Sequence, residues 1–158
     1  MKAILWMLSL TFVTMVGCSK LEPRQQLLQD KKCLKCDLKG ENFSQADLQK
    51  AVLNGSDLSD ANLSQANLSS SLLDSVNLSS ANLSGANLSQ AGLSLANLSS
   101  CNLQGANLQK AYLRGADLTG ANLAGADLTE ADLSATKLEK ASFKGAKLKG
   151  ALMPDGWK

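Results

Sequence analysis

The stretch that decides the fold reads Ala81-Asn82-Leu83-Ser84-Gly85-Ala86-Asn87-Leu88, which contains one unit of five residues and the first three residues of the next unit. The same phase holds from residue 36 to residue 155 and gives 24 consecutive units, of which 21 are centred on Leu. Ala stands two places before the centre in 17 units, and Asn or Asp stands one place before it in 16. So regular a repeat determines the architecture before any local propensity is considered.

A spacing of five fits neither an α-helix nor a flat strand. On a helix, successive Leu residues would lie about 140° apart and form no stripe. On a strand, an odd spacing would send them to opposite faces. The pattern works only if the chain turns a corner in every unit, so that each Leu points inward again. The sequence therefore predicts an all-β solenoid of stacked coils, paired as parallel strands about 4.8 Å apart.

The other positions of the unit follow from this geometry. The residue two before the centre also points inward, where Ala fits and Ser56, Ser71, Val76 and Thr136 are small enough. Asn and Asp suit a corner because their side chains bond to nearby backbone groups. The two residues after the centre are mostly Ser, Gln, Lys, Gly, Thr and Glu, and we expect them to face water.

An internal register indicates how many units make one coil. Eight units lack Asn or Asp before the centre, and five of their residues share a spacing of 20 that only Asp132 interrupts. These five are Val52, Leu72, Gly92, Tyr112 and Leu152. Four units per coil give a square section with one distinctive face. The 24 units then form about six coils, a rod about 29 Å long.

Residues 36–155 resemble the pentapeptide repeat family, whose consensus is Ala-(Asp/Asn)-Leu-X-X. The resemblance implies a right-handed quadrilateral β-helix with the centre residue and the residue two before it buried. Some members of the family mimic DNA with an acidic surface and protect gyrase in the cytosol. That is the alternative function for this chain.

Residues 1–18 are typical of a secretory signal, because Lys2 is followed by an apolar stretch too short to favour a membrane span. Met15-Val16-Gly17-Cys18 resembles the bacterial lipobox, which implies acylation of Cys18 and a lipid anchor in the cell envelope, facing the periplasm or the exterior. A soluble secreted or periplasmic protein and an uncleaved anchor remain open alternatives. Met15, where the lipobox usually has Leu, departs from the motif.

The segments that flank the repeat are expected to cover its ends. Residues 19–35 form a linker and an N-terminal cap, with a short helix that begins near Pro23. Residues 156–158 form a C-terminal cap, in which Trp157 is placed to lie over the open core. Solenoids need such covers because their end coils have no neighbour.

The remaining cysteines raise a redox question. Cys33 and Cys36 form a C-x-x-C, for which a disulfide, a metal half-site or a redox pair are the options. The chain has no His, so we expect no zinc site and no other metal or cofactor. Export favours a disulfide that ties the cap to the first coil. Cys101 takes an inward position and is expected to be free and buried.

Little in the sequence supports enzymatic chemistry. Without His the commonest general base is missing, and the Asp residues occupy outward corner positions. Glu41 is the one acid at an inward position, and we expect it to reach solvent from the first coil. We therefore expect no catalytic residues, no small-molecule substrate and no enzyme.

Charge separates the ends of the chain from its middle. Residues 1–35 sum to +4, residues 36–135 to −6 and residues 136–158 to +4. This distribution and the signal argue against a nucleic-acid partner or mimic. The sequence predicts a scaffold anchored to a membrane that contacts a protein partner or a second copy. The candidate contact residues share the distinctive face: Val52, Leu72, Leu95, Tyr112 and Leu152.

Overall fold

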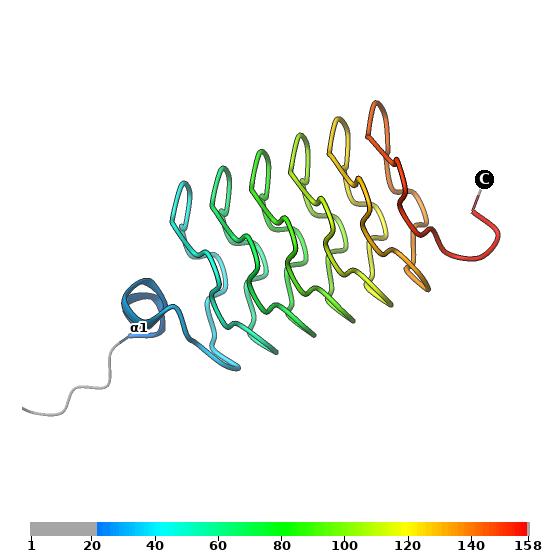
Figure 1. The fold of residues 1–158 in the computed structure, drawn as a ribbon. Helices are drawn as coiled ribbons and strands as arrows, with labels where there is room; N and C mark the ends of the chain where they lie inside the picture. The colour runs from blue at the N-terminus through cyan, green and yellow to red at the C-terminus, as the bar shows by residue number, and fades with distance from the viewer. Residues whose placement is uncertain (1–21, 158) are drawn as a thin grey trace, which may run out of the picture.

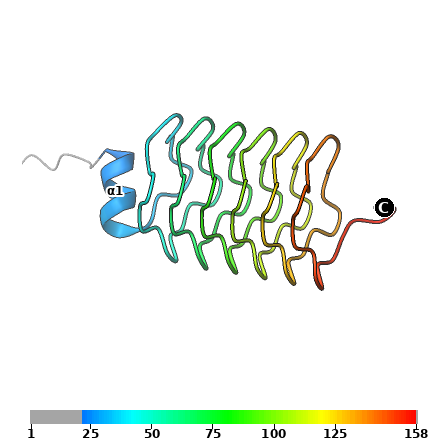
Figure 2. The ribbon, with the colours of Figure 1, turned by 90° about the horizontal axis from the view of Figure 1, so that it is seen from above.

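The computed structural model describes residues 22–157, and the signal with Cys18 lies outside them. The described chain is a helix, α1 (Pro23–Asp30), followed by a stack of square coils that advance along one axis. Figure 2 shows the same stack from above, with α1 across one end and the C-terminal tail leaving the other. The repeat therefore forms a rod, and α1 begins where the sequence predicts.

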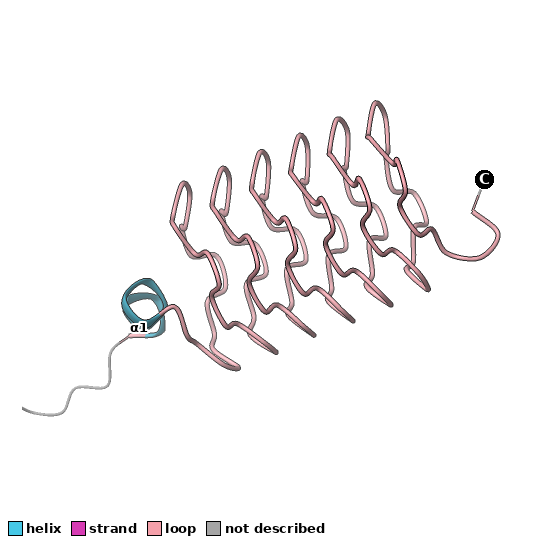
Figure 3. Cartoon of the chain, in the orientation of Figure 1, coloured by secondary structure: helices cyan, strands magenta, loops and turns pink. Residues whose placement is uncertain are grey.

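Parallel bridges hold the coils together. Each bridge joins residues 20 apart, from Lys32 to Val52 at one end and from Asp132 to Leu152 at the other. In the middle of the rod the Leu83 N–H donates to Asn102 O at 2.8 Å, and the Asn82 N–H donates to Ala61 O at 2.9 Å. Only one residue of each unit makes such a bridge, so the repeat has isolated bridges and no strand of two or more residues. Figure 3 therefore draws the repeat as loop. Four units per coil is the period that the sequence predicts.

The corners use a left-handed backbone conformation two residues after each centre. Gly85 takes it with φ 64° and Gln90 with φ 58°. Glycine adopts such dihedrals without steric cost, while Gln and Ser must be held there by their surroundings. The regular coil supplies that support, because the N–H groups of Gly85 and Gln90 both bond to carbonyl oxygens of the next coil.

The interior is a column of Leu and small side chains. Leu83, Leu88, Leu103 and Leu108 are all 0% exposed, as the period predicts. Polar substitutes at the small inward position bond to backbone carbonyl groups. The Ser56 hydroxyl donates to Cys33 O at 2.7 Å. The interior thus accepts hydroxyls because each one finds an acceptor.

The two ends of the rod are finished differently. At the first coil, Pro23 occupies the first turn of α1, Lys31 ends the helix in a left-handed conformation, and Leu27 is completely buried. At the last coil, Leu138 and Phe143 are only partly buried. Trp157 contacts Phe143 edge-on, with ring centroids 5.9 Å apart. The core is therefore closed at the α1 end and partly open at the other.

Candidate interaction surface

The distinctive face of the rod carries a row of outward apolar side chains. Bridges connect Val52 to Leu72, Leu72 to Gly92, Gly92 to Tyr112 and, through Asp132, on to Leu152, so these residues lie in line along the axis. Leu72 is 48% exposed, Tyr112 57% and Leu152 62%. Val52 is half-buried. We call Val52, Leu72, Leu95, Tyr112 and Leu152 the apolar row.

Leu95 extends this row from a corner. It has φ 58° and is 70% exposed, the highest value among the large apolar residues described. A Cβ added to Gly115, one coil further along, would lie 2.9 Å from a methyl carbon of Leu95. Leu95 therefore lies over a glycine of the neighbouring coil, which leaves most of its side chain in solvent.

Gly92 leaves a gap in the row, and the carboxylate of Asp74 lies in this gap. Gly92 has no side chain that could bond to the N–H of Ser94, as Asn does in other units. Instead Asp74 of the preceding coil accepts from that N–H at 3.1 Å and from the Asn54 amide at 3.2 Å. The apolar row is therefore interrupted between Leu72 and Tyr112 by a carboxylate that is already hydrogen-bonded.

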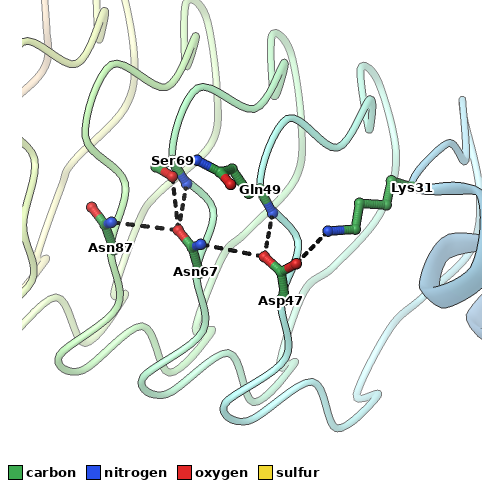
Figure 4. A network of polar contacts seen from close by, with 6 residues as sticks. All are labelled: Lys31, Asp47, Gln49, Asn67, Ser69 and Asn87. Atoms are coloured by element: carbon green, nitrogen blue, oxygen red, sulfur yellow. Dashed lines mark hydrogen bonds and ion pairs between the residues drawn. The ribbon is translucent and has the colours of Figure 1, made fainter.

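The other three faces carry polar ladders. Asn or Asp at the bridging position accepts from the N–H two residues on, as Asn67 does from Ser69 at 3.2 Å. The Asn amide also donates to the residue 20 positions earlier: Asn67 donates to Asp47 at 3.3 Å, and Asn87 to Asn67 at 3.4 Å. Figure 4 shows this ladder, which begins with the ion pair between Lys31 and Asp47. These side chains stabilise the corners, and their hydrogen-bonding groups are already bonded to one another and to the backbone.

Hydrogen bonds lower the pKa of several carboxyl groups at the bridging positions. The Thr119 hydroxyl and N–H lower the pKa of Asp117, and those of Thr129 lower the pKa of Asp127. The Ser134 hydroxyl and N–H do the same to Asp132, at 2.6 and 2.9 Å. Each bond favours the ionised form, so these groups stabilise the folded rod when they are charged.

We expect the rod to lose stability in acid. Because the folded pKa values lie below the unfolded value of about 3.9, the contribution is complete above about pH 5 and is lost as the pH falls through the folded values. Thermal melting should stay constant between about pH 8 and 5 and fall below about pH 4. A variant with Asp117→Asn, Asp127→Asn and Asp132→Asn keeps the acceptor oxygen and should show a flatter profile. Identical profiles for the two proteins would contradict this cause.

The two cysteines of the C-x-x-C lie at the junction between α1 and the first coil. The structure has their sulfurs bonded, with Cα atoms 5.6 Å apart. Cys101 is free and buried, and burial raises the pKa of its thiol to about 12. A thiol that stays protonated is a poor nucleophile, so Cys101 is a structural residue. Among residues 22–157, no three His, Cys, Asp or Glu side chains gather in a way that could hold a metal ion.

We expect Cys33 and Cys36 to be joined in the protein isolated from cells. Alkylation without reductant, followed by mass spectrometry, should find both blocked. Cys101 should react only after unfolding, because it is 1% exposed. Two free thiols at positions 33 and 36 in freshly isolated protein would contradict the disulfide.

Glu41 has a partner that sequence reasoning missed. Its carboxylate lies 3.4 Å from the Arg24 guanidinium of α1, and both side chains are nearly half exposed. The expectation that it reaches solvent agrees with this placement, but the ion pair with α1 needs the helix to be docked.

None of the helices in residues 22–157 is long and apolar enough to cross a membrane.

The stacked square coils with buried centre residues define a β-solenoid, and comparison with known families identifies it. The pattern described as pentapeptide repeats, with eight copies, matches residues 96–134 and 116–153. The pattern described as a pentapeptide repeat region matches residues 30–99. The chain belongs to the pentapeptide repeat family, whose members form right-handed quadrilateral β-helices.

Solved structures of similar proteins include HetL, a pentapeptide repeat protein involved in heterocyst differentiation regulation in the cyanobacterium Nostoc sp. strain PCC 7120. The two chains are 27% identical over 80% of this chain and 88% of HetL, with a TM-score of 0.50. A pentapeptide repeat protein of the Arabidopsis thaliana thylakoid lumen is 31% identical over 66% of each chain, with a TM-score of 0.49.

QnrB1, a plasmid-mediated fluoroquinolone resistance protein, is 21% identical over 79% of this chain and 83% of its own, with a TM-score of 0.34. A likeness this distant says nothing about the function of this chain. No curated protein sequence matches the chain significantly.

Proposed function

We propose that this chain is a non-enzymatic scaffold of the cell envelope that contacts a protein partner, or a second copy, through the apolar row. The observation that carries the proposal is that Leu72 and Tyr112 line up on one face and Leu95 lies at its corner, each 48–70% exposed. Leu72 and Tyr112 lie two coils apart with Gly92 between them, which is about 10 Å at the spacing of paired strands. A single partner element is long enough to cover both.

The contrast between the four faces supports this assignment. On three faces, the bridging Asn and Asp side chains bond along the ladder and to the backbone. Such groups gain little from a partner, because their hydrogen bonds are already made. Removing the apolar row from water would release free energy without breaking any of them. Tyr112 is the best anchor, since buried aromatic residues contribute strongly to interfaces.

The remaining features fit a rigid support. About six coils form the rod, and α1 closes its N-terminal end through Leu27, which is 0% exposed. The chain contains no His, and the Asp carboxylates of the ladders already accept backbone hydrogen bonds. A scaffold needs only this rigidity, and we propose no catalytic role.

We further propose that acylated Cys18 anchors the rod to a membrane of a bacterial envelope. Only residues 19–22 separate Cys18 from Pro23 at the start of α1. At about 3.6 Å per residue, this tether holds the α1 end within roughly 18 Å of the bilayer. The apolar row would then run away from the membrane along the rod, where a partner can reach it.

The test replaces Leu72, Leu95 and Tyr112 with Ser. All three side chains are largely exposed, so we expect melting to change little. Chemical crosslinking in cells should lose the product formed by the wild-type chain. The matched control replaces the exposed residues Gln49, Gln104 and Gln109 with Ser and should crosslink as the wild type does. A triple apolar variant that crosslinks like the wild type would contradict the contact.

A further inference from the structure

The last coil presents an unfinished parallel edge. In earlier coils the N–H of each centre residue donates to a carbonyl 19 residues on, as Leu128 does to Lys147 O at 2.8 Å. Within residues 22–157, the N–H groups of Leu138, Phe143 and Leu148 have no such acceptor. Their side chains are also only partly buried. Unpaired backbone groups beside partly open apolar core make this end a template for another coil.

The first coil offers the opposite edge, but α1 covers it. Leu27 of α1 is 0% exposed, so it packs against the core of the coil. Arg24 pairs with Glu41 at 3.4 Å, and Lys31 pairs with Asp47. Figure 4 shows Lys31 reaching the first member of an Asn ladder from outside the stack. The helix thus uses basic side chains to satisfy acidic groups of the first coil.

The two edges match in register on three of the four faces; on the fourth, Lys32 bridges Val52 and must leave together with α1. Three ladders end at Lys137, Ser142 and Lys147 in the last coil. The same three ladders start at Asp37, Asn42 and Asp47 in the first coil. A first coil stacked on a last coil would therefore place Asp over Lys in two ladders and Asn over Ser in the third.

The rod itself shows that such pairs form at this spacing. Lys137 Nζ lies 3.4 Å from Asp117 Oδ2, and Lys147 Nζ lies 3.2 Å from Asp127 Oδ2, each pair one coil apart. A second copy would put another carboxylate on the far side of each lysine at the same step. Two C-terminal ends, by contrast, would bring together segments that each carry +4 over residues 136–158. Like charges oppose that contact.

We propose that the C-terminal end of one rod fits the first coil of a second copy, head to tail, and that α1 blocks this contact by occupying the first coil. A head-to-tail contact along one axis does not close, so it would build a filament. The helix therefore decides whether the chain remains a single rod or extends. This inference is independent of the apolar row, which lies on the side of the rod.

The C-terminal tail is a second, weaker obstacle. Residues 154–157 leave the last coil near its open end, and Trp157 contacts Phe143 there. Trp157 is still 41% exposed, so its contact with Phe143 buries the ring only in part. The tail must move aside for a second rod to stack, and Trp157→Ala should make stacking easier.

The test releases α1 in the full chain and follows association by sedimentation velocity, in the same detergent for every variant. The wild type should give one species. Leu27→Asp, which places a charge in the buried contact of α1, should give a series of species beyond the dimer that grows with concentration. Adding Lys137→Glu and Lys147→Glu should weaken this association at least about tenfold. Adding Asp37→Lys and Asp47→Lys to those changes reverses both pairs and should restore it.

A matched control changes two lysines of the same coil that lie outside the ladders. Lys144→Glu and Lys149→Glu alter the net charge equally and should weaken association about threefold or less. If Leu27→Asp unfolds the rod by circular dichroism, Arg24→Glu with Lys31→Glu releases the helix without touching the core. A helix-released protein that stays single, stops at a dimer, or associates regardless of the ladder charges would overturn the proposal.

Discussion

Replacing Leu83 or Leu103 with Ala in the middle of the rod will lower the free energy of unfolding by about 2–5 kcal/mol for each change. Both side chains are 0% exposed. The cavity cannot collapse easily, because backbone bonds to the coils on either side, such as Leu83 N–H to Asn102 O at 2.8 Å, fix the walls. Leu88 and Leu108 occupy equivalent positions and should behave alike. Urea unfolding measures the loss.

The control for this prediction lies one residue away from each core position. Ser84 and Ser89 follow buried centres and face outward with intermediate exposure. Ser84→Ala or Ser89→Ala should change the free energy of unfolding by no more than about 0.5 kcal/mol. Equal losses at the Leu and Ser positions would mean that the inward and outward faces are assigned wrongly.

Replacing Cys18 with Ala will abolish incorporation of labelled palmitate if the anchor is the one proposed. The reason is chemical: the lipobox reaction attaches acyl chains to the Cys sulfur and, after cleavage, to its amino group, and Ala has no thiol to receive the first of them. The variant should accumulate as an unprocessed precursor, which runs more slowly on a gel. Cys101→Ala is the matched control and should label normally, since Cys101 is buried in the rod.

A different result for the wild-type chain would rule out the lipid anchor. A wild-type chain that is recovered in the soluble fraction, with its mature N-terminus at a residue other than Cys18, would contradict lipidation. The chain would then be a secreted or periplasmic protein. The apolar row would keep its proposed role, because its geometry does not depend on the anchor.

The sequence predicts the coil and its faces correctly because both depend on local periodicity. A five-residue period forces a corner in each unit, and the 20-residue register of Val52, Leu72 and Tyr112 matches the spacing of the bridges. Small inward substitutes such as Ser56 and Thr136 are buried as expected. The aligned row of apolar residues follows from the same arithmetic.

Interactions between coils are harder to foresee because they depend on how side chains extend along the axis. The Asn amide ladder needs each amide to reach the residue 20 positions earlier, as Asn97 reaches Asn77 at 3.1 Å. Asp74 caps Ser94 only because Gly92 lies between them without a side chain. The pairing of Arg24 with Glu41 requires a docked helix. The repeat pattern encodes none of these contacts directly.

The polar ladders also explain why one face stands out. Where Asn or Asp occupies the bridging position, its oxygen caps the N–H two residues on, as Asn102 does for Gln104 at 3.2 Å. Leu72 and Tyr112 have no such oxygen, so their two units lack this cap, although Asp132 on the same face supplies it to Ser134. We interpret the loss as the cost of presenting apolar groups to a partner.

Photo-crosslinking from single positions around the rod, in intact cells, tests the contact most directly. A photoreactive residue replaces Tyr112 on the apolar row, or Asn102, Asn107 or Asp117, each of which lies on a different polar ladder. The account predicts a discrete crosslinked product from position 112, lost when Leu72 and Leu95 are changed to Ser, and none from the other three positions. Equal yields from all four positions, or a product only from a polar face, would contradict it.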